Sequence, residues 1–314
     1  MADYDIELMI KVVEMYYLDD VPQREIAQKL NLSRPKVSRL LKTAREQNFV
    51  SIKINYPNSV RSELEKTFES VFGLKEAVIV SNVNDSYYRT FTEVTETAAK
   101  YLRRIVKEDD SIGVAWGRTL KAVVDSIGFA ERKNIKAIQI IGSLGQSSES
   151  ANEIVRKMAE SFGGRSFILP APAIVDSPQI RNAIVMDNTI QEILNKAKSV
   201  SIALIGIGNI DESSSFFSTG YLKPEDLAAL KQEKAVGDIC AHFFDIDGKL
   251  CTNIENRVIA LSVKDLKNIS RVIGIATGKE KAKSILGALK SGILDVLITD
   301  EKTARLVMRL SIEN

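Results

Sequence analysis

The sequence has few of the residues that build metal sites, disulfide frameworks or histidine-based catalytic centres. Its 314 residues include one histidine, His242, and two cysteines, Cys240 and Cys251. One histidine excludes a His-rich metal site, and two cysteines without zinc-ligand spacing exclude a disulfide framework. We therefore expect no metal, no cofactor and no catalytic residue. The cysteines are expected to be free buried thiols, although they could also meet across a hairpin.

Long apolar runs are lacking as well. No stretch approaches the roughly 18 residues of a transmembrane helix, and the acidic N-terminus has no basic region followed by a cleavage site. The content of 45% hydrophobic and 27% charged residues is typical of a globular protein. The sequence therefore predicts a cytoplasmic chain that is long enough for one large domain or two ordinary ones.

The positive charge of the chain is concentrated between residues 21 and 56. This stretch holds eight Lys and Arg but only two Glu, a local balance of +6, whereas the whole chain carries +2. Such a concentration of positive charge is what attraction to nucleic-acid phosphates requires.

Two short helices joined by a tight turn are predicted within this basic stretch. The first covers residues 23–30. In the second, Ser33 is a suitable N-cap, Pro35 fits the first turn, and apolar residues from Val37 to Ala44 recur with helical spacing. Any amphipathic surface helix shows this period, but the charge favours a helix-turn-helix that binds DNA. The predicted DNA contacts are Gln23, Arg24, Ser33, Arg34, Lys36, Ser38, Arg39 and Lys42.

The pattern around the helix pair predicts an N-terminal all-α domain. A helix at 5–18 is expected to cover the pair. Alternating residues at 50–54 predict a strand that would add a small wing. The Pro- and Asn-containing stretch 56–59 is interpreted as a linker. We therefore expect a DNA-binding domain at 1–56 and a second domain at 57–314.

From residue 59 onward, helical and strand patterns alternate. Strands are expected at 76–81, 111–115, 135–141, 166–169, 200–206, 238–244, 271–276 and 296–299, and a hairpin at Asp247-Gly248 is expected to join 238–244 to 249–252. Regular alternation of this kind predicts an α/β domain with a mostly parallel sheet covered by helices on both faces.

Ligands of such sheets bind at the carboxyl ends of the strands. Three junctions there, 113–119, 141–146 and 276–281, are short and rich in Gly and hydroxyl residues. Amides freed by glycine at a helix N-terminus, together with Lys281, suit a phosphate group. Ordinary turns also use glycine, and none of the three is a Walker loop, so a non-nucleotide phosphate ligand and a structural role both stay open. Asp238 could accept sugar hydroxyls or be a turn carboxylate, and His242 is more typical of a packed or surface histidine.

The sequence resembles the SorC family of bacterial transcriptional regulators over essentially its whole length. The similarity rests on residues 15–50 and on the motifs FGLKEAVIV (72–80), SIGVAWGRTL (111–120), VSIALIGIG (200–208), AVGDICAHFFDIDG (235–248) and ATGKEKAKSILGAL (276–289). This resemblance implies a second domain with the sugar-isomerase fold of ribose-5-phosphate isomerase and glucosamine-6-phosphate deaminase. It also implies a phosphorylated sugar or polyol as effector, and a homo-oligomer, usually a tetramer built as a dimer of dimers.

The resemblance also implies a set of effector-binding residues. They are Gly117, Arg118, Thr119 and Leu120 in the phosphate turn, Lys281 and Gly278 in the last junction, Asp238 for the sugar hydroxyls, and Gly142 and Ser143 after the third strand. Ser143 departs from the family pattern, in which a second glycine is usual. Ile141 stands where the deoxyribonucleoside regulator has a lysine that forms a Schiff base, so covalent capture there is excluded and deoxyribose-5-phosphate is not expected. The WGR motif is closest to the sorbitol/sorbose regulator, which indicates a hexitol or ketose phosphate.

Three functions are compatible with these patterns. The favoured hypothesis is a non-enzymatic regulator of a carbohydrate operon, which binds double-stranded operator DNA and a phosphorylated effector. A sugar-phosphate isomerase or deaminase with an appended DNA-binding domain would need a general base, for which Asp238 is the only candidate. A constitutive DNA-binding protein whose sheet domain only forms oligomers would bind no sugar phosphate.

Overall fold

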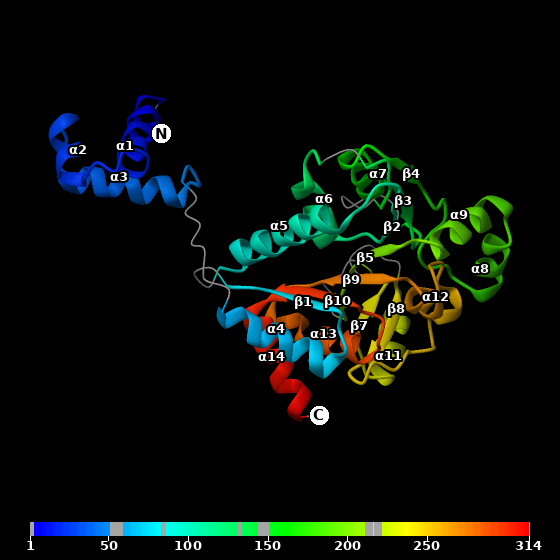
Figure 1. The fold of residues 1–314 in the computed structure, drawn as a ribbon. Helices are drawn as coiled ribbons and strands as arrows, with labels where there is room; N and C mark the ends of the chain where they lie inside the picture. Colours follow the sequence, from blue (N-terminus) through cyan, green and yellow to red (C-terminus); the bar gives the residue numbers. More distant parts are fainter. Residues whose placement is uncertain are drawn as a thin grey trace. The chain divides into compact units, whose positions relative to one another are not determined.

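The computed structural model describes residues 3–50, 59–82, 86–130, 133–143, 151–210, 216 and 222–313. Within it the chain divides into two compact units, Met1–Asn58 and Ser59–Asn314 (Figure 1). The predicted wing strand at 50–54 and linker at 56–59 lie largely outside the described residues. The wing and the domain boundary at residue 56 therefore stay predictions.

The described part of the first unit is a helix-turn-helix covered by a third helix. Its helices are α1 (Asp3–Tyr17), α2 (Gln23–Lys29) and α3 (Arg34–Glu46). Their apolar faces meet in a core of Val12, Ile26, Ala27, Val37 and Leu41. Ser33 caps α3 by accepting a hydrogen bond from the amide of Lys36, and Pro35 occupies the first turn. The predicted helix-turn-helix is thus confirmed, and burial of one α3 stripe leaves the opposite face to solvent.

The second unit is built on a seven-stranded sheet whose six neighbouring pairs are all parallel. In spatial order the strands are β1 (Glu76–Val80), β10 (Val296–Asp300), β9 (Arg271–Ile275), β5 (Ile202–Gly206), β2 (Ser111–Val114), β3 (Lys136–Gln139) and β4 (Arg165–Phe167). The central strand β5 is almost wholly apolar and buried, as a strand covered on both faces must be. The predicted mostly parallel α/β sheet is confirmed.

Helices cover both faces of this sheet (Figure 1). One face carries α5 (Tyr87–Ile105), α6 (Arg118–Ile127) and α7 (Ala151–Ser161), and the other carries α4 (Ser59–Phe72), α13 (Ala282–Lys290) and α14 (Glu301–Glu313). The remaining described α-helices are α8 (Pro178–Val185), α9 (Asn188–Lys198), α11 (Pro224–Gln232) and α12 (Val263–Lys267). The sequence analysis did not predict helix α8. None of its residues is fully buried, so its apolar residues show only a weak helical period.

A small antiparallel sheet follows β5 along the chain. It contains β6 (Gly208–Asn209), β7 (Ala235–Ile239) and β8 (His242–Asp245). The single strand predicted at 238–244 is wrong, because the chain reverses at Cys240 and Ala241. Both residues have positive φ, +52° and +65°, as a two-residue hairpin turn requires. Such turns normally contain Asn and Gly, so Cys-Ala carried no turn signal. The Asp247-Gly248 turn is present, but beyond it only an isolated bridge joins Leu250 to Phe244.

Three properties expected from the composition can be compared with this fold. No helix in the described ranges is long and apolar enough to cross a bilayer. Cys240 and Cys251 are buried free thiols, as predicted, and burial raises the pKa of both. The described residues contain no group of three or more His, Cys, Asp and Glu side chains that could hold a metal ion.

Candidate functional site

The candidate effector site lies at the carboxyl ends of four neighbouring strands, β9, β5, β2 and β3. Each of these strands leads into a segment with a predicted effector residue or its direct partner: Lys281 after β9, Gly208 after β5, Gly117 after β2 and Gly142 after β3. Asp238 joins them from the small sheet, where it pairs with Gly208. The sheet order therefore brings together residues that are up to 164 positions apart in the chain, at the edge where parallel sheets bind ligands.

Helix α6 begins at the predicted phosphate turn. Its N-cap, Gly117, has a φ of +125°, which favours glycine, and no described side chain caps the helix. The amides of Arg118, Thr119 and Leu120 have no partner within the helix, and a free helix N-terminus attracts anions. The Arg118 guanidinium lies 3.4 Å from the Tyr87 hydroxyl, and the Leu120 side chain is buried. Leu120 can therefore offer an anion only its amide, whereas the exposed Arg118 can offer both its amide and its guanidinium.

Trp116 ties the phosphate turn to the loop after β3. Its indole N–H donates a hydrogen bond to the Gly142 carbonyl at 2.9 Å. Its ring packs edge-on against Phe216, which packs in the same way against Phe243, with centroid distances of 5.1 and 5.7 Å. Phe243 pairs with Asp238 across the hairpin. The sequence analysis used Trp116 only as part of the WGR motif and did not place it among the effector-binding residues, although it is the chain's one tryptophan and directly precedes the turn.

Asp238 is the buried carboxylate of the site. It is 7% exposed, and its Oδ2 accepts a hydrogen bond from the Ala241 amide at 3.2 Å. Gly208 approaches so closely that a Cβ there would lie 1.8 Å from Oδ1, so this contact requires a glycine. Burial raises the pKa of Asp238 to about 6, against the opposing effects of the Ala241 amide, Lys281 and His242. Above that pH the carboxylate is ionised and can accept hydrogen bonds from hydroxyls.

Lys281 reaches the same region from the 3₁₀ helix η2 (Lys279–Lys281). Its Nζ donates a hydrogen bond to the Ile207 carbonyl, directly after β5, at 2.7 Å, and its charge acts to lower the pKa of Asp238. Lys281 is half-buried, whereas Lys279 in the same turn is exposed. Lys281 therefore supplies positive charge at the sheet edge where the phosphate turn lies.

Three other predicted residues use their amides within the protein. The amides of Gly142, Ser143 and Gly278 donate to Ile259 O, Ala171 O and Asp300 Oδ2, at 2.9, 2.8 and 3.1 Å. These bonds fix the loops after β3 and β9. The three residues thus shape the site through the backbone, and a direct contact with an effector stays a prediction for each of them.

Asp300, the last residue of β10, holds the turn after β9. Its buried carboxylate accepts hydrogen bonds from the Thr277 hydroxyl, the Gly278 amide and Thr303. Burial acts to raise the pKa of Asp300, but the bonds from Thr303 and Thr277 hold it below its ordinary value. A lowered pKa means that the ionised form contributes stability above the unfolded-state pKa, and that this stability is lost as the pH falls through the folded-state pKa.

We expect Asp300→Ala to lower the free energy of unfolding by about 3 kcal/mol, because several buried donors lose their acceptor. Urea unfolding at neutral pH measures this effect. Glu301→Ala removes the neighbouring carboxylate, whose partner Arg305 lies on the helix surface, and should cost less than about 1 kcal/mol. Equal losses in the two variants would contradict the role given to Asp300.

The predicted DNA contacts lie on the outer face of α3 and at the start of α2. Arg24, Ser33, Arg34, Lys36, Ser38, Arg39 and Lys42 are exposed, and Gln23 is half-buried. Arg45 differs from them, because its Nε donates to the Tyr17 hydroxyl at 2.7 Å and its guanidinium lies over the Tyr17 ring. Arg45 thus ties α3 to α1, while the exposed residues form a basic surface suited to a phosphate backbone.

Comparison with known proteins supports this two-part organisation. Residues 56–309 match the family described as "Putative sugar-binding domain", and residues 9–47 match sigma-70, region 4. The deoxyribonucleoside regulator of Bacillus subtilis (strain 168) is 33% identical over 302 residues, which cover 95% of this chain and 96% of that protein. The sorbitol operon regulator of Klebsiella pneumoniae is 32% identical over 312 residues, covering 97% and 98%.

Solved structures show the same similarity. The full-length sorbitol operon regulator SorC from Klebsiella pneumoniae has a TM-score of 0.76 at 32% identity, covering 97% of this chain and 99% of that one. A transcriptional regulator from Streptococcus pneumoniae TIGR4 has a TM-score of 0.77 at 27% identity, covering 81% and 98%. The resemblance inferred from the motifs is confirmed: the chain belongs to the SorC family of bacterial transcriptional regulators, with an N-terminal helix-turn-helix and a C-terminal sugar-binding domain.

Proposed function

We propose that this chain regulates the transcription of a carbohydrate-utilisation operon under the control of a phosphorylated sugar or polyol. The observation that supports this most directly is the clustering of three groups at one sheet edge. They are the uncapped N-terminus of α6, the ammonium of Lys281 and the buried carboxylate of Asp238. The first two suit a phosphate group, and the third suits sugar hydroxyls. A sugar phosphate carries both kinds of group.

The effector is a hexitol or ketose phosphate that binds without a covalent bond. This proposal rests on the WGR motif at 116–118 and on Ile141. The Ile141 side chain is apolar and buried, and it cannot form the imine that a lysine there would form. The deoxyribonucleoside regulator is a relative at 33% identity, but the Schiff base described for it above is not proposed for this chain.

The protein acts as a homo-oligomer, a tetramer, in the cytoplasm, where its operator DNA lies. One helix-turn-helix contacts too little DNA for tight specific binding, so a second half-site must be engaged by another copy. Effector binding would change the subunit arrangement and hence the spacing of the half-sites. Sedimentation of the full chain tests this, because a monomer at the concentrations that bind operator would contradict it.

The protein is not an isomerase or deaminase. Proton transfer on a sugar phosphate needs a positioned acid–base group. Both ring nitrogens of His242 are engaged in hydrogen bonds with oxygen atoms of the protein. Asp238 is therefore the single general-base candidate among the described residues of the site. An assay of turnover with ketose and amino-sugar phosphates tests this, and measurable turnover would favour the enzyme.

Lys281→Ala is expected to weaken effector binding about 10- to 100-fold, because one hydrogen bond to a charged group contributes about 1.5–3 kcal/mol. Trp116 is the chain's one tryptophan and adjoins the phosphate turn, so its fluorescence can report binding. The probes are pentose, hexose, ketose and polyol phosphates, each titrated alone. Operator binding without effector should not change.

Lys279→Ala is the matched control for this variant, because it removes an exposed lysine from the same turn. It should bind effector as the wild-type chain does. If Lys281→Ala responds at the same ligand concentration as the control, the phosphate is bound elsewhere.

A further inference from the structure

A strained turn lies beside the predicted acceptor of the sugar hydroxyls. Cys240 and Ala241, which follow Asp238 closely, both adopt left-handed backbone conformations with φ of +52° and +65°. Residues with side chains rarely adopt this conformation, and it persists where the surrounding structure enforces it. The strain has a local result, because the turn directs the Ala241 amide at Oδ2 of Asp238. A neighbouring group must therefore hold the turn in place.

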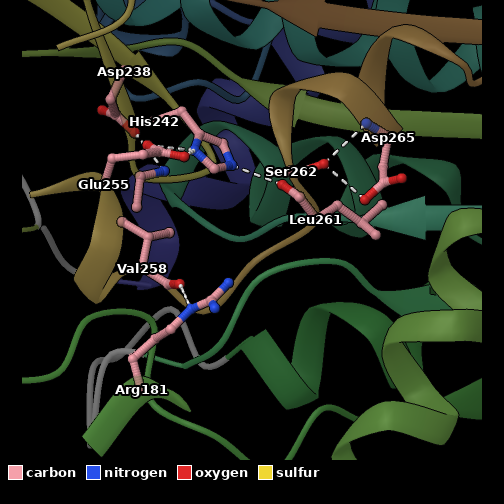
Figure 2. Close-up of polar contacts among 9 residues, drawn as sticks. Arg181, Asp238, His242, Glu255, Val258, Leu261, Ser262 and Asp265 are labelled. Atoms are coloured by element: carbon pink, nitrogen blue, oxygen red, sulfur yellow. Dashed lines mark hydrogen bonds and ion pairs between the residues drawn. The ribbon is translucent and has the colours of Figure 1, made fainter. Parts of the chain in front are cut away.

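The next residue, His242, is held at both ring nitrogens (Figure 2). Its Nδ1 lies 2.9 Å from each carboxylate oxygen of Glu255 in the 3₁₀ helix η1 (Glu255–Arg257). Its Nε2 lies 2.7 Å from the carbonyl oxygen of Leu261. A carbonyl oxygen only accepts, so Nε2 donates to Leu261, while Nδ1 faces the carboxylate of Glu255. The ring is 3% exposed, so the position that it fixes is shielded from water.

Both partners of His242 belong to one segment, residues 254–261, which we call the strap. The Leu261 amide donates to the Ile140 carbonyl, and the Ile259 carbonyl accepts from the Gly142 amide, both at 2.9 Å. The strap therefore lies against the loop after β3, whose Gly142 carbonyl in turn receives the indole N–H of Trp116. One continuous set of hydrogen bonds thus runs from the β7–β8 turn to the phosphate turn.

The strap also contacts α8. Arg181 of α8 donates from Nε to the Val258 carbonyl at 3.2 Å (Figure 2), and Ile259 packs in a small core with Ile190 of α9. The strap is therefore anchored on the side away from His242 as well, which makes it a firm support for the histidine ring.

We propose that His242 is a positioning residue of the effector site, which locks Asp238 and the strap into the arrangement that receives the sugar hydroxyls. This inference rests on the proposed function, because it requires Asp238 to contact the effector. His242 acts through its neighbours. It holds the turn that orients Asp238, and it joins that turn to the loop of Gly142.

The charged groups around the ring predict a second measurable effect of this role, on the pH dependence of effector binding. Glu255 from η1 and Asp238 from β7 both face His242, and both His242 and Lys281 from η2 act to lower the pKa of Asp238. Without the ring, the pKa of Asp238 would rise further. The pH below which effector binding is lost would then be higher. A loss of packing alone would not produce this change.

His242→Asn and His242→Gln separate the two hydrogen bonds. An Asn amide can replace Nδ1 and keep the contact with Glu255, whereas a Gln amide can replace Nε2 and keep the contact with Leu261. The probe is each phosphate of the panel that changes Trp116 fluorescence in the wild-type chain. We expect each variant to bind it about tenfold more weakly or worse, as when residues that orient metal ligands are removed. The pH of half-maximal binding should also rise.

Ser262→Ala is the matched control, because it removes the N-cap of α12 next to the strap and leaves both contacts of His242 in place. The unfolding temperature and effector-free operator binding show which variants are folded. If the histidine variants do not fold, Glu255→Ala removes the Nδ1 partner at a half-exposed position, and its effector affinity is then the readout. Folded variants with wild-type affinity and an unchanged pH profile overturn the role of His242 alone. A wild-type chain that binds no phosphate of the panel overturns the proposed function, and this inference with it.

Discussion

Asp238→Asn is expected to make the protein more stable and at the same time unresponsive to its effector. Burial raises the pKa of Asp238 from 3.8 to about 6, so the ionised carboxylate is unfavourable in the folded state. Asparagine has nearly the same shape, carries no charge and can still accept the hydrogen bond of the Ala241 amide. The substitution therefore removes a destabilising charge and leaves the turn intact.

The pH dependence of this gain follows from the sign of the shift. An acid whose pKa is higher in the folded state binds protons more readily when folded, so its contribution to stability falls as the pH rises from 3.8 to about 6 and is constant above that. One pKa unit corresponds to about 1.4 kcal/mol. The asparagine variant should therefore gain up to about 3 kcal/mol at pH 8 and almost nothing near pH 4. Urea unfolding at both pH values measures this difference.

A matched control exists in a second buried carboxylate. Asp226 forms an ion pair with Arg257, and both side chains are largely buried. Asp226→Asn leaves that guanidinium without its charged partner, so this variant should lose stability. A loss in the Asp238 variant similar to that in the Asp226 variant would show that the ionised carboxylate of Asp238 does not destabilise the folded state.

The loss of effector response has a separate cause. Hydrogen bonds from sugar hydroxyls to an ionised carboxylate are stronger than those to an amide, and one such bond contributes about 1.5–3 kcal/mol. Fluorescence titration at pH 8 should therefore show binding at least about tenfold weaker. A gain in stability combined with a loss of binding is typical of a residue kept for function. Unchanged effector affinity would remove Asp238 from the site.

Local patterns predicted the elements whose stabilising contacts are also local. The Ser33 cap, Pro35 and the buried stripe of α3 lie within a dozen residues, and the predicted helix agrees with the observed one. The apolar run of β5 and the glycine turn at Gly117 were found for the same reason. Each of these signals depends on a short-range rule that a sequence displays directly.

The contacts that complete the site are distant in sequence and leave no such signal. His242 forms hydrogen bonds with residues 13 and 19 positions away. The amides of Gly142 and Gly278 donate hydrogen bonds to segments far along the chain. The raised pKa of Asp238 depends on burial by the folded domain. The turn at Cys240–Ala241 is enforced by tertiary contacts against the preference of its residues. Sequence rules could therefore identify Asp238 and Lys281 as candidates, but not the network that holds them.

Arg39→Ala is expected to weaken specific operator binding strongly and to leave effector binding unchanged. Arg39 is exposed in the middle of α3, and the neighbouring Val37 and Leu41 face the core. A guanidinium that reads a guanine through two hydrogen bonds contributes about 1–3 kcal/mol of discrimination. An oligomer on two half-sites loses this contact twice, which corresponds to about 30-fold to 20,000-fold weaker binding.

Gel-shift titration against operator and unrelated DNA at one salt concentration measures this loss. Lys11→Ala, which removes an exposed charge from α1, is the matched control and should bind operator normally. Lys42→Ala should weaken binding to both DNAs and reduce the salt dependence by about one ion, as expected of a phosphate contact. Normal operator affinity of Arg39→Ala would show that α3 is not the reading helix. We expect Arg39→Ala alone to lose operator binding and Asp238→Asn alone to lose the effector response. That pair of results would establish that DNA reading and effector sensing depend on separate residues of the two units.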